Sequence, residues 1–298
     1  MRAIDGHTRL VGVMGWPVEH TVSPAMHNAA FDAAGLNWRY VPLAVQPDRV
    51  GEAVHGLRAL GFAGCNVTVP HKRAVMDHLD EITGQARAIG AVNTIVIQRE
   101  GRMVGHNTDA VGFLRALTER GFRAEGKRAV ILGAGGAARA VAYGLASSGA
   151  TVTILNRTLL RAKSLVADLN SFFPSLPLRS FPLDFLNLSQ EVSSADLLVN
   201  ATSLGMWPEV QGSPWPEDLS MAFSLTVFDL VYNPPETKLM CQARAAGAQA
   251  IGGLRMLVHQ GATAWELWTG QKAPVEVMAA AAKAAFSERE SEEQCCGF

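Results

Sequence analysis

Short apolar runs alternate with stretches of helical spacing through the first 110 residues. Apolar runs at 10–15, 38–45 and 62–69 predict buried strands. Helical patterns follow at 23–34, at 47–60 and from Pro70 onward, and a further helix is expected over 108–120. Segments 91–98 and 102–105 predict a hairpin that turns at Glu100 and Gly101. Strands that alternate with helices indicate a mainly parallel sheet covered on both faces.

Turn and cap residues mark the ends of the first two helices. Ser23 is suited to the N-cap position and Pro24 to the first helical turn. Gly35 and Gly61 follow the two helical patterns and predict where these helices end.

The remainder of the chain predicts a doubly wound second unit. A polar segment at 121–127 is the expected junction to this unit, a strand at 128–133 and a helix at 136–148 follow it, and further strands are expected at 151–155, 195–200 and 225–230. Segment 174–182 predicts a loop with one short strand, and the tail over 253–286 is helical. We therefore expect a mainly parallel α/β domain at 1–110, a Rossmann-like domain at 111–252, and C-terminal helices at 253–298 that pack back on the first domain.

Composition limits the class of protein. Hydrophobic residues fill 48% of the 298 positions, charged residues fill 18%, and the net charge is -1. These values favour large buried cores over disorder and give no bulk attraction to nucleic acid or a membrane surface. No apolar segment is long enough for a membrane helix, and no signal peptide is evident.

The four cysteines predict neither a disulfide framework nor a metal site, so a cytoplasmic location is expected. The ending Cys295-Cys296-Gly297-Phe298 matches a prenylation signal only formally, because its middle positions are not aliphatic.

A glycine-rich turn predicts the cofactor site. The sequence Gly133-Ala134-Gly135-Gly136-Ala137 follows a strand and opens a helix, and Ala138 ends the pattern. The first glycine permits a tight turn, the second lets the backbone approach a pyrophosphate, and the helix N-terminus favours the phosphate charge. The alternative is a simple glycine turn before an alanine-rich helix.

The end of the next strand indicates NADP. An NAD enzyme usually places a carboxylate there for the ribose hydroxyls. This chain instead has Asn156, Arg157 and Thr158, with Arg161 one turn later. Two guanidinium groups suit a 2′-phosphate, although solvated surface arginines remain the alternative.

Several polar residues in the first half of the chain lie at or just after the ends of predicted strands. Ligands of parallel sheets bind beyond the carboxyl ends of the strands, and buried polar groups without partners are costly. A shared binding site is therefore expected, with loop capping or a structural ion pair between Lys72 and Asp109 as the alternatives. The residues concerned are Asn66, Thr68, Lys72, Asn93, Thr94, Asn107, Thr108 and Asp109.

Together these segments resemble the shikimate dehydrogenase family. No single motif is specific, but nine segments occur in the family's order. They cover residues 15–28, 66–72, 91–94, 107–109, 133–138, 156–158, 201–206, 229–232 and 256–261.

The resemblance implies an NADPH-dependent, reversible reduction of 3-dehydroshikimate to shikimate, a step toward chorismate and the aromatic amino acids. It implies that domain 1–110 binds the substrate and carries out catalysis and that domain 111–252 binds NADP. It implies Lys72 and Asp109 as the catalytic pair and no metal. The implied substrate-binding residues are Thr21, Ser23, Asn66, Thr68, Asn93, Tyr232 and Gln260. The implied cofactor contacts are Gly133, Ala134, Gly135, Gly136, Ala137, Asn156, Arg157, Thr158, Arg161, Leu230 and Gly253. The only expected partner besides NADP is the small-molecule substrate, bound by a monomer or homodimer.

One position departs from the family pattern. The first motif usually reads Ser-x-Ser-Pro, whereas this chain has Thr21 two residues before Ser23. Threonine keeps the hydroxyl and adds a methyl group, so a quinate/shikimate dehydrogenase with relaxed substrate use stays open. A non-catalytic NADP-sensing regulator on the same scaffold is the second alternative, because fold alone does not establish activity.

Overall fold

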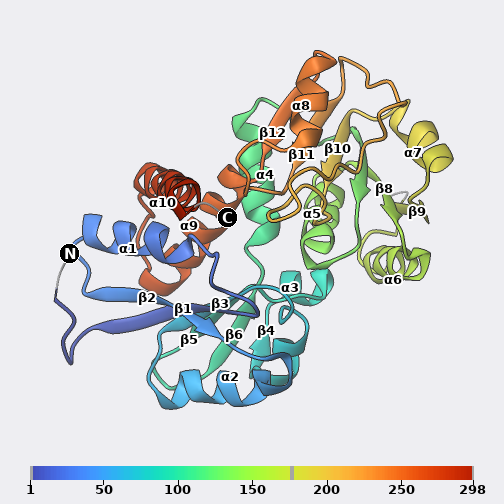
Figure 1. The fold of residues 1–298 in the computed structure, drawn as a ribbon. Helices are drawn as coiled ribbons and strands as arrows, with labels where there is room; N and C mark the ends of the chain where they lie inside the picture. Colours follow the sequence, from blue (N-terminus) through green and yellow to red (C-terminus); the bar gives the residue numbers. More distant parts are fainter. Residues whose placement is uncertain (1–2, 175–177, 297–298) are drawn as a thin grey trace. The chain divides into compact units, whose positions relative to one another are not determined.

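The computed structural model describes residues 3–174 and 178–296, with side chains described up to residue 287 (Figure 1). The chain forms two compact units. The first contains the residues up to Thr108 together with those from Val258 onward, and the second contains Asp109–Leu257. The side chains of Cys295 and Cys296, and all of Gly297 and Phe298, lie outside the described part.

The first unit is built on a six-stranded mixed sheet of order β2-β1-β3-β5-β6-β4 (Figure 1). Pairs β1/β2, β1/β3 and β4/β6 are parallel, whereas β3/β5 and β5/β6 are antiparallel. The β5/β6 pair is the predicted hairpin, and the sheet is mainly parallel as expected. The strands are β1 Arg9–Gly15, β2 Trp38–Ala44, β3 Gly64–Val67, β4 Glu81–Ile82, β5 Thr94–Ile97 and β6 Met103–His106.

Helices cover both faces of this sheet, as a buried sheet requires. Side chains alternate along β3, so Cys65 joins the apolar core under α2, while Gly64 faces the ring of Trp268 on α9. α10 packs on α1. The helices are α1 Ser23–Ala33, η1 Pro47–Arg49, α2 Val50–Ala59, η2 Ala74–His78, α3 Gly84–Ile89, α9 Leu254–Thr269, which begins in the second unit, and α10 Val275–Cys296.

Two local expectations for the first unit were wrong. The N-cap of α1 is Val22 rather than Ser23, and Ser23 is the first helical residue; the Thr21 hydroxyl instead accepts from the Ser23 backbone N–H at 3.3 Å. No α-helix starts at Pro70. The His71 N–H turns back to the Thr68 carbonyl at 2.9 Å, and only the short 3-10 helix η2 follows.

The second unit is a parallel six-stranded sheet of order β12-β11-β10-β7-β8-β9. The order reverses beside β7, which is the doubly wound arrangement that binds dinucleotides at its switch point. Helices α4, α5 and α6 pack on one core and α7 and α8 on the other. The strands are β7 Arg128–Leu132, β8 Thr151–Asn156, β9 Leu178–Pro182, β10 Leu197–Asn200, β11 Thr226–Asp229 and β12 Gln249–Gly252. The helices are α4 Asp109–Glu119, α5 Gly136–Ser147, α6 Leu159–Asn170, α7 Phe185–Val192 and α8 Lys238–Ala245.

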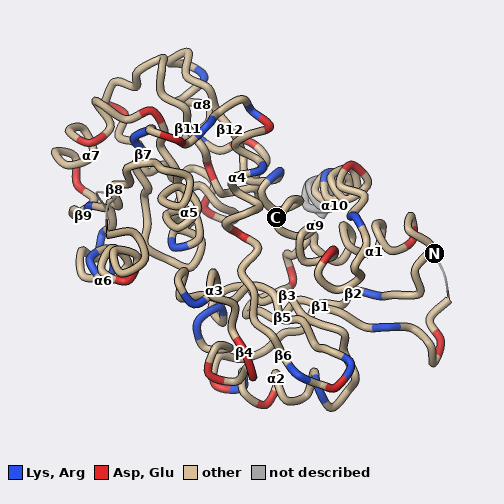
Figure 2. Tube along the Cα trace, turned by 180° about the vertical axis from the view of Figure 1, so that it is seen from behind, with Lys and Arg blue, Asp and Glu red and all other residues tan. Residues whose placement is uncertain are grey.

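Charged residues of both signs are interspersed over each unit (Figure 2). This distribution agrees with the near-zero net charge. Among the described residues, no helix has the length and apolar character needed to cross a membrane.

Candidate active site

Polar side chains from three strand ends meet at one edge of the first unit's sheet. Because β5 runs antiparallel to β3, its first residue, Thr94, lies opposite Asn66 on β3 and His106 on β6. Asn93 precedes β5, and Thr108 comes two residues after β6. The sequence prediction that these segments converge is confirmed for Asn66, Asn93, Thr94 and Thr108 by the contacts below.

Asn66 and Asn93 are almost fully buried, and both are hydrogen-bonded to Thr94. The Asn66 amide donates to the Thr94 hydroxyl at 3.0 Å and to the Asn93 carbonyl at 3.2 Å. The Thr94 hydroxyl in turn donates to Asn93 Oδ1 at 3.1 Å. These bonds offset the cost of burying the amides and fix both side chains before any ligand arrives.

Asn93 extends this network to the α9 helix. Its Nδ2 donates to the Thr108 hydroxyl at 2.9 Å and to Gln260 Oε1 at 3.4 Å, while Oδ1 accepts from the Thr108 N–H at 2.7 Å. Gln260 comes from a segment more than 150 residues away in the chain. We name this set the polar cluster: Asn66, Asn93, Thr94, Thr108 and Gln260.

The N-terminus of α1 adds two hydroxyl groups. Ser23 is buried, with 8% of its surface exposed, and Thr21 is half-buried. The Ser23 hydroxyl is close enough to the Tyr40 phenol to act on its pKa, which it lowers against the larger effect of burial. Tyr40 also donates to Asn66 Oδ1 at 2.8 Å, so it connects the helix to the polar cluster.

Tyr40 was not predicted from the sequence to belong to the site. It lies among the apolar residues of β2, a pattern that predicts a core residue. A signal was available, because a buried tyrosine hydroxyl normally needs a hydrogen-bond partner.

Lys72 and Thr68 belong to the chain that leaves β3. Thr68 packs closely on Gly15, where an added Cβ would lie 2.4 Å from its methyl group. The backbone carbonyl of half-buried Lys72 accepts from the Val92 N–H at 2.8 Å. The turn is held further by the His71 ring, whose Nε2 is 2.7 Å from the Val45 carbonyl oxygen.

Asp109 and Tyr232 fall in the second unit, unlike the other residues that were predicted to bind or transform the substrate. Asp109 is buried and is the first residue of α4, where the helix dipole favours a negative charge. Tyr232 is half-buried and lies three residues beyond β11.

The glycine turn between β7 and α5 has the geometry that was predicted for a phosphate loop. Gly133 has φ +111°, and a Cβ there would lie 2.8 Å from the Ala201 carbonyl oxygen. A Cβ on Gly135 would meet nothing within 4 Å, so space is open above this residue. Gly135 is also the N-cap of α5 and offers no side-chain cap, which leaves backbone N–H groups to meet a phosphate.

The end of β8 places basic groups on the surface. Asn156 Nδ2 donates to the Thr158 carbonyl at 2.8 Å and so fixes the turn into α6. Arg157 and Arg161 are exposed, and within the described residues neither forms an ion pair. Both guanidinium groups are therefore available to a phosphate.

A buried carboxylate supports the segment after β11 that contains Leu230, against which Gly253 packs. Asp229 accepts from Asn200 Nδ2 at 2.9 Å, from the Val231 N–H at 3.0 Å and from the Thr237 hydroxyl at 2.7 Å. Its burial raises the pKa of the carboxyl group, and these donors oppose the rise. Gly253 packs against the Leu230 carbonyl, where a Cβ would approach the oxygen to 2.2 Å.

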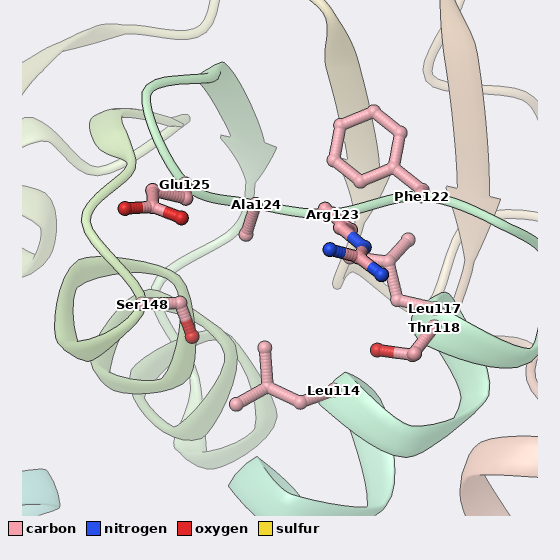
Figure 3. Close-up of a pocket in the computed structure, with 8 residues that line it drawn as sticks. All are labelled: Leu114, Leu117, Thr118, Phe122, Arg123, Ala124, Glu125 and Ser148. Carbon is pink, nitrogen blue, oxygen red and sulfur yellow. The ribbon is translucent and has the colours of Figure 1, made fainter.

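A surface pocket of about 430 Å³ lies elsewhere in the second unit (Figure 3). Its lining comes from α4, the segment before β7 and Ser148, and none of the eight lining residues was predicted to belong to the site. The chemistry of the glycine turn and the polar cluster, rather than this pocket, identifies the candidate site. In the described part of the chain, no three His, Cys, Asp or Glu side chains are grouped as metal ligands.

Sequence comparison matches three family profiles along the chain. Residues 13–95 match the shikimate dehydrogenase substrate-binding domain, 116–205 match shikimate/quinate 5-dehydrogenase, and 253–283 match the shikimate 5′-dehydrogenase C-terminal domain. A shikimate dehydrogenase (NADP⁺) from Methanopyrus kandleri is 50% identical over 93% of this chain and 95% of its own length.

Solved structures agree with these sequence matches. A shikimate dehydrogenase crystallised with NADP⁺ has a TM-score of 0.89 at 40% identity, covering 95% of this chain and 98% of its own. A quinate dehydrogenase from Corynebacterium glutamicum in complex with NAD has a TM-score of 0.86 at 32% identity, covering 93% and 99%. On this identity and coverage, the chain belongs to the shikimate dehydrogenase family.

Proposed function

We propose that this protein is an NADP-dependent shikimate dehydrogenase, which reduces 3-dehydroshikimate to shikimate reversibly. The observation that carries the proposal is the mutually hydrogen-bonded polar cluster, buried except at half-buried Gln260, in a member of this family. Its internal bonds hold amides and hydroxyls in fixed positions, and a polyhydroxylated ring is a ligand that such a preorganised set suits.

The polar cluster and its neighbours form the proposed substrate site. Ser23 and Thr21 supply hydroxyls for the substrate carboxylate, and Asn66, Asn93 and Gln260 are the proposed contacts of the ring hydroxyls, Asn66 through the acceptor capacity that its Oδ1 keeps beside the bond from Tyr40. Thr68 and Tyr232 complete the proposed set. Fixed amides discriminate well between substrates, because a ligand that lacks a hydroxyl leaves a buried group unpaired.

The second unit is the proposed NADP-binding unit, with 133–137 at the pyrophosphate. Arg157 and Arg161 hold the 2′-phosphate, together with Asn156 and Thr158 at the start of α6. Leu230 and Gly253 border the nicotinamide. When bound, NADPH supplies the hydride.

Lys72 and Asp109 are the proposed catalytic pair. Lys72, as an ammonium, stabilises the negative charge that develops on the carbonyl oxygen and donates a proton to it. In the reverse direction the amine accepts the proton of the substrate hydroxyl. Asp109 accepts a hydrogen bond from a substrate hydroxyl and so helps to hold the ring. We place the enzyme in the cytoplasm as a monomer or homodimer.

Quinate is the second candidate substrate, and a specific position favours it. Thr21 adds a methyl group where the family pattern has serine, and a similar structure is that of a quinate dehydrogenase. One methyl group in a pocket changes discrimination by about 1–3 kcal/mol, so both substrates can be accepted at different rates.

A four-way oxidation assay tests the proposal. The purified protein is given shikimate or quinate, each with NADP⁺ or NAD⁺, and the absorbance of the reduced nicotinamide is followed. We expect the largest kcat/KM with shikimate and NADP⁺. Faster turnover of quinate would move the chain to the quinate branch, and a preference for NAD⁺ would contradict the role of Arg157. Absence of turnover in every pair would favour a non-catalytic NADP-sensing regulator.

The Lys72→Ala variant tests the chemical assignment in the same assay. Loss of a general acid typically lowers the rate by about 10²–10⁴-fold, so kcat should fall far more than the affinity for shikimate. Lys283→Ala, which changes an exposed lysine on α10, is the matched control and should retain wild-type turnover. Turnover by Lys72→Ala close to that of the control would overturn the assignment.

A further inference from the structure

We propose that Tyr40 is a positioning residue for the substrate: its hydroxyl sets the spacing between Ser23 and Asn66. This inference rests on the proposed function, because it concerns how the substrate site of that reaction is held.

The Tyr40 hydroxyl meets two residues of the proposed site at once. It donates to Asn66 Oδ1 at 2.8 Å, and the Ser23 hydroxyl acts on the same phenol as a donor that lowers its pKa. Tyr40 is 2% exposed and Asn66 is 6% exposed, so water does not replace these bonds. A buried phenol could have been satisfied by any backbone carbonyl, yet both partners here are side chains that are proposed to contact substrate.

The backbone of Tyr40 is fixed to the helix that carries Ser23. Asn28 on α1 accepts from the Tyr40 N–H at 2.8 Å and donates to the Tyr40 carbonyl at 3.0 Å. This pair of bonds ties β2 to α1 one and a half turns from Ser23. Rotation or translation of the helix start relative to the sheet would break it.

Aromatic packing fixes the ring of Tyr40 as well. The His27 ring stacks on it at a centroid distance of 4.3 Å with an interplanar angle of 1°, and the Trp268 ring lies 6.1 Å away at a tilt of 48°. The phenol therefore has little freedom to move its oxygen. Burial also raises the pKa of Tyr40 well above its usual value, so the group stays a neutral donor.

The rotating hydrogens of the two hydroxyls suit such a role. When a substrate carboxylate binds, the Ser23 hydroxyl can turn its proton toward it while the Tyr40 oxygen stays in place. Asn66 remains held by its bonds to Thr94 and the Asn93 carbonyl. Tyr40 thus acts through Ser23 and Asn66 and has no contact with the reacting carbonyl in this scheme.

The Tyr40→Phe variant removes one oxygen and keeps the ring, the stacking and the backbone bonds to Asn28. We expect the KM for shikimate to rise about tenfold, as for the loss of one orienting hydrogen bond, while the KM for NADP⁺ stays at its wild-type value. Tyr143→Phe is the matched control. It removes a phenol oxygen from a residue on α5 that packs on Phe173, outside the proposed site.

A double-mutant cycle separates positioning from mere packing. Ser23→Ala is combined with Tyr40→Phe and, separately, with Tyr143→Phe. If Tyr40 acts through Ser23, the changes in shikimate KM are non-additive for the first pair and additive for the second. Thermal unfolding of each variant, together with its NADP⁺ affinity, checks that the fold is retained.

The outcomes are distinct. A Tyr40→Phe protein with wild-type KM for shikimate, or additive effects in the Ser23 pair, would overturn the Tyr40 proposal and leave the proposed function standing. An equal rise in KM for both shikimate and NADP⁺ would also overturn it, because only general loosening acts on both. A wild-type protein that does not bind shikimate would overturn the proposed function itself.

Discussion

His27 lies on α1 with neither ring nitrogen hydrogen-bonded. It is completely buried between Tyr40, Phe31 and Trp268, and Gly261 leaves it room, since a Cβ there would lie 3.2 Å from Nε2. The apolar surroundings lower the pKa of His27 to about 3, because burial penalises the charged ring. The folded protein therefore keeps this ring neutral.

Stability should consequently fall in acid. Below pH 6.5 the unfolded chain binds a proton at His27 that the folded chain does not bind until about pH 3. The free energy of unfolding is then lost as pH falls through this window, by up to about 1.4 kcal/mol per pH unit from this residue. We expect His27→Gln to flatten the acid side of the stability curve between pH 6.5 and 4, as measured by urea unfolding.

His55→Gln, at an exposed histidine on α2, is the control for this measurement. It should leave the slope as in the wild type. An unchanged slope in His27→Gln would show that His27 becomes protonated in the folded state without cost.

Residues at strand ends could be predicted from the sequence, whereas those inside strands could not. Asn66 and Asn93 interrupt or border apolar runs, and that interruption is visible in the sequence. Tyr40 fits an apolar strand in both size and pattern, so only the partners of its hydroxyl, which come from α1 and β3, reveal its role. These partners lie 17 and 26 positions away, and spacing alone does not indicate them.

At the scale of elements, the β7–α5 turn shows why two neighbouring glycines are needed for different reasons. Gly133 combines a positive φ with a Cβ position only 2.8 Å from a backbone oxygen, whereas Gly135 has φ −84° and open space around it. Gly133 is thus required by the backbone conformation of the fold, and Gly135 by the close approach of a ligand to the turn.

This difference gives a paired prediction. Gly133→Ala should lower the free energy of unfolding by about 1–3 kcal/mol, because the residue must adopt a strained conformation and displace backbone. Gly135→Ala should unfold like the wild type but have a clearly higher KM for NADP⁺, because its methyl group occupies space that is left for the pyrophosphate. Chemical denaturation and steady-state kinetics on both variants measure the two effects. Equal stability of the two variants would contradict the assignment of Gly133 to the fold.

Strands with a clear apolar run were predicted, whereas β4, β12 and the helix α6 were not. The strands β1, β2, β7 and β8 follow clear apolar runs. The two-residue β4 leaves no comparable pattern, because a strand this short is specified by its neighbours in the sheet, and β12, with Gln249 and Gly252 at its ends, contains no apolar run. The α1 cap was misplaced by one residue, which is typical of boundaries that depend on one local hydrogen bond.

For the whole molecule, the order of the chain matters. The second unit interrupts the first, since the chain leaves the first unit after Thr108 and returns at Val258. The sheet of the second unit and both of its cores lie within Asp109–Leu257. The first unit, by contrast, depends on α9 and α10, because Trp268 donates to the Ile95 carbonyl at 3.0 Å and Trp265 stacks near Phe31.

The isolated segment 109–257 should therefore fold and bind NADP⁺, whereas the isolated segment 3–108 should not fold stably. A cooperative thermal transition that shifts upward with NADP⁺ is expected for the first segment only, because a ligand stabilises the state that binds it. A stable, cooperatively unfolding 3–108 segment would show that α9 and α10 are dispensable for the first unit.

The interrupted first unit has a consequence during synthesis on the ribosome. Strands β1 to β6 emerge first, but the tryptophans that pack on Ile95 and Phe31 emerge only after the second unit has been made. Domains generally complete their folding in the order in which they are translated. Here the order is reversed: the portion that is begun first is completed last, and its apolar surface stays open to chaperones while residues 109–257 are being made.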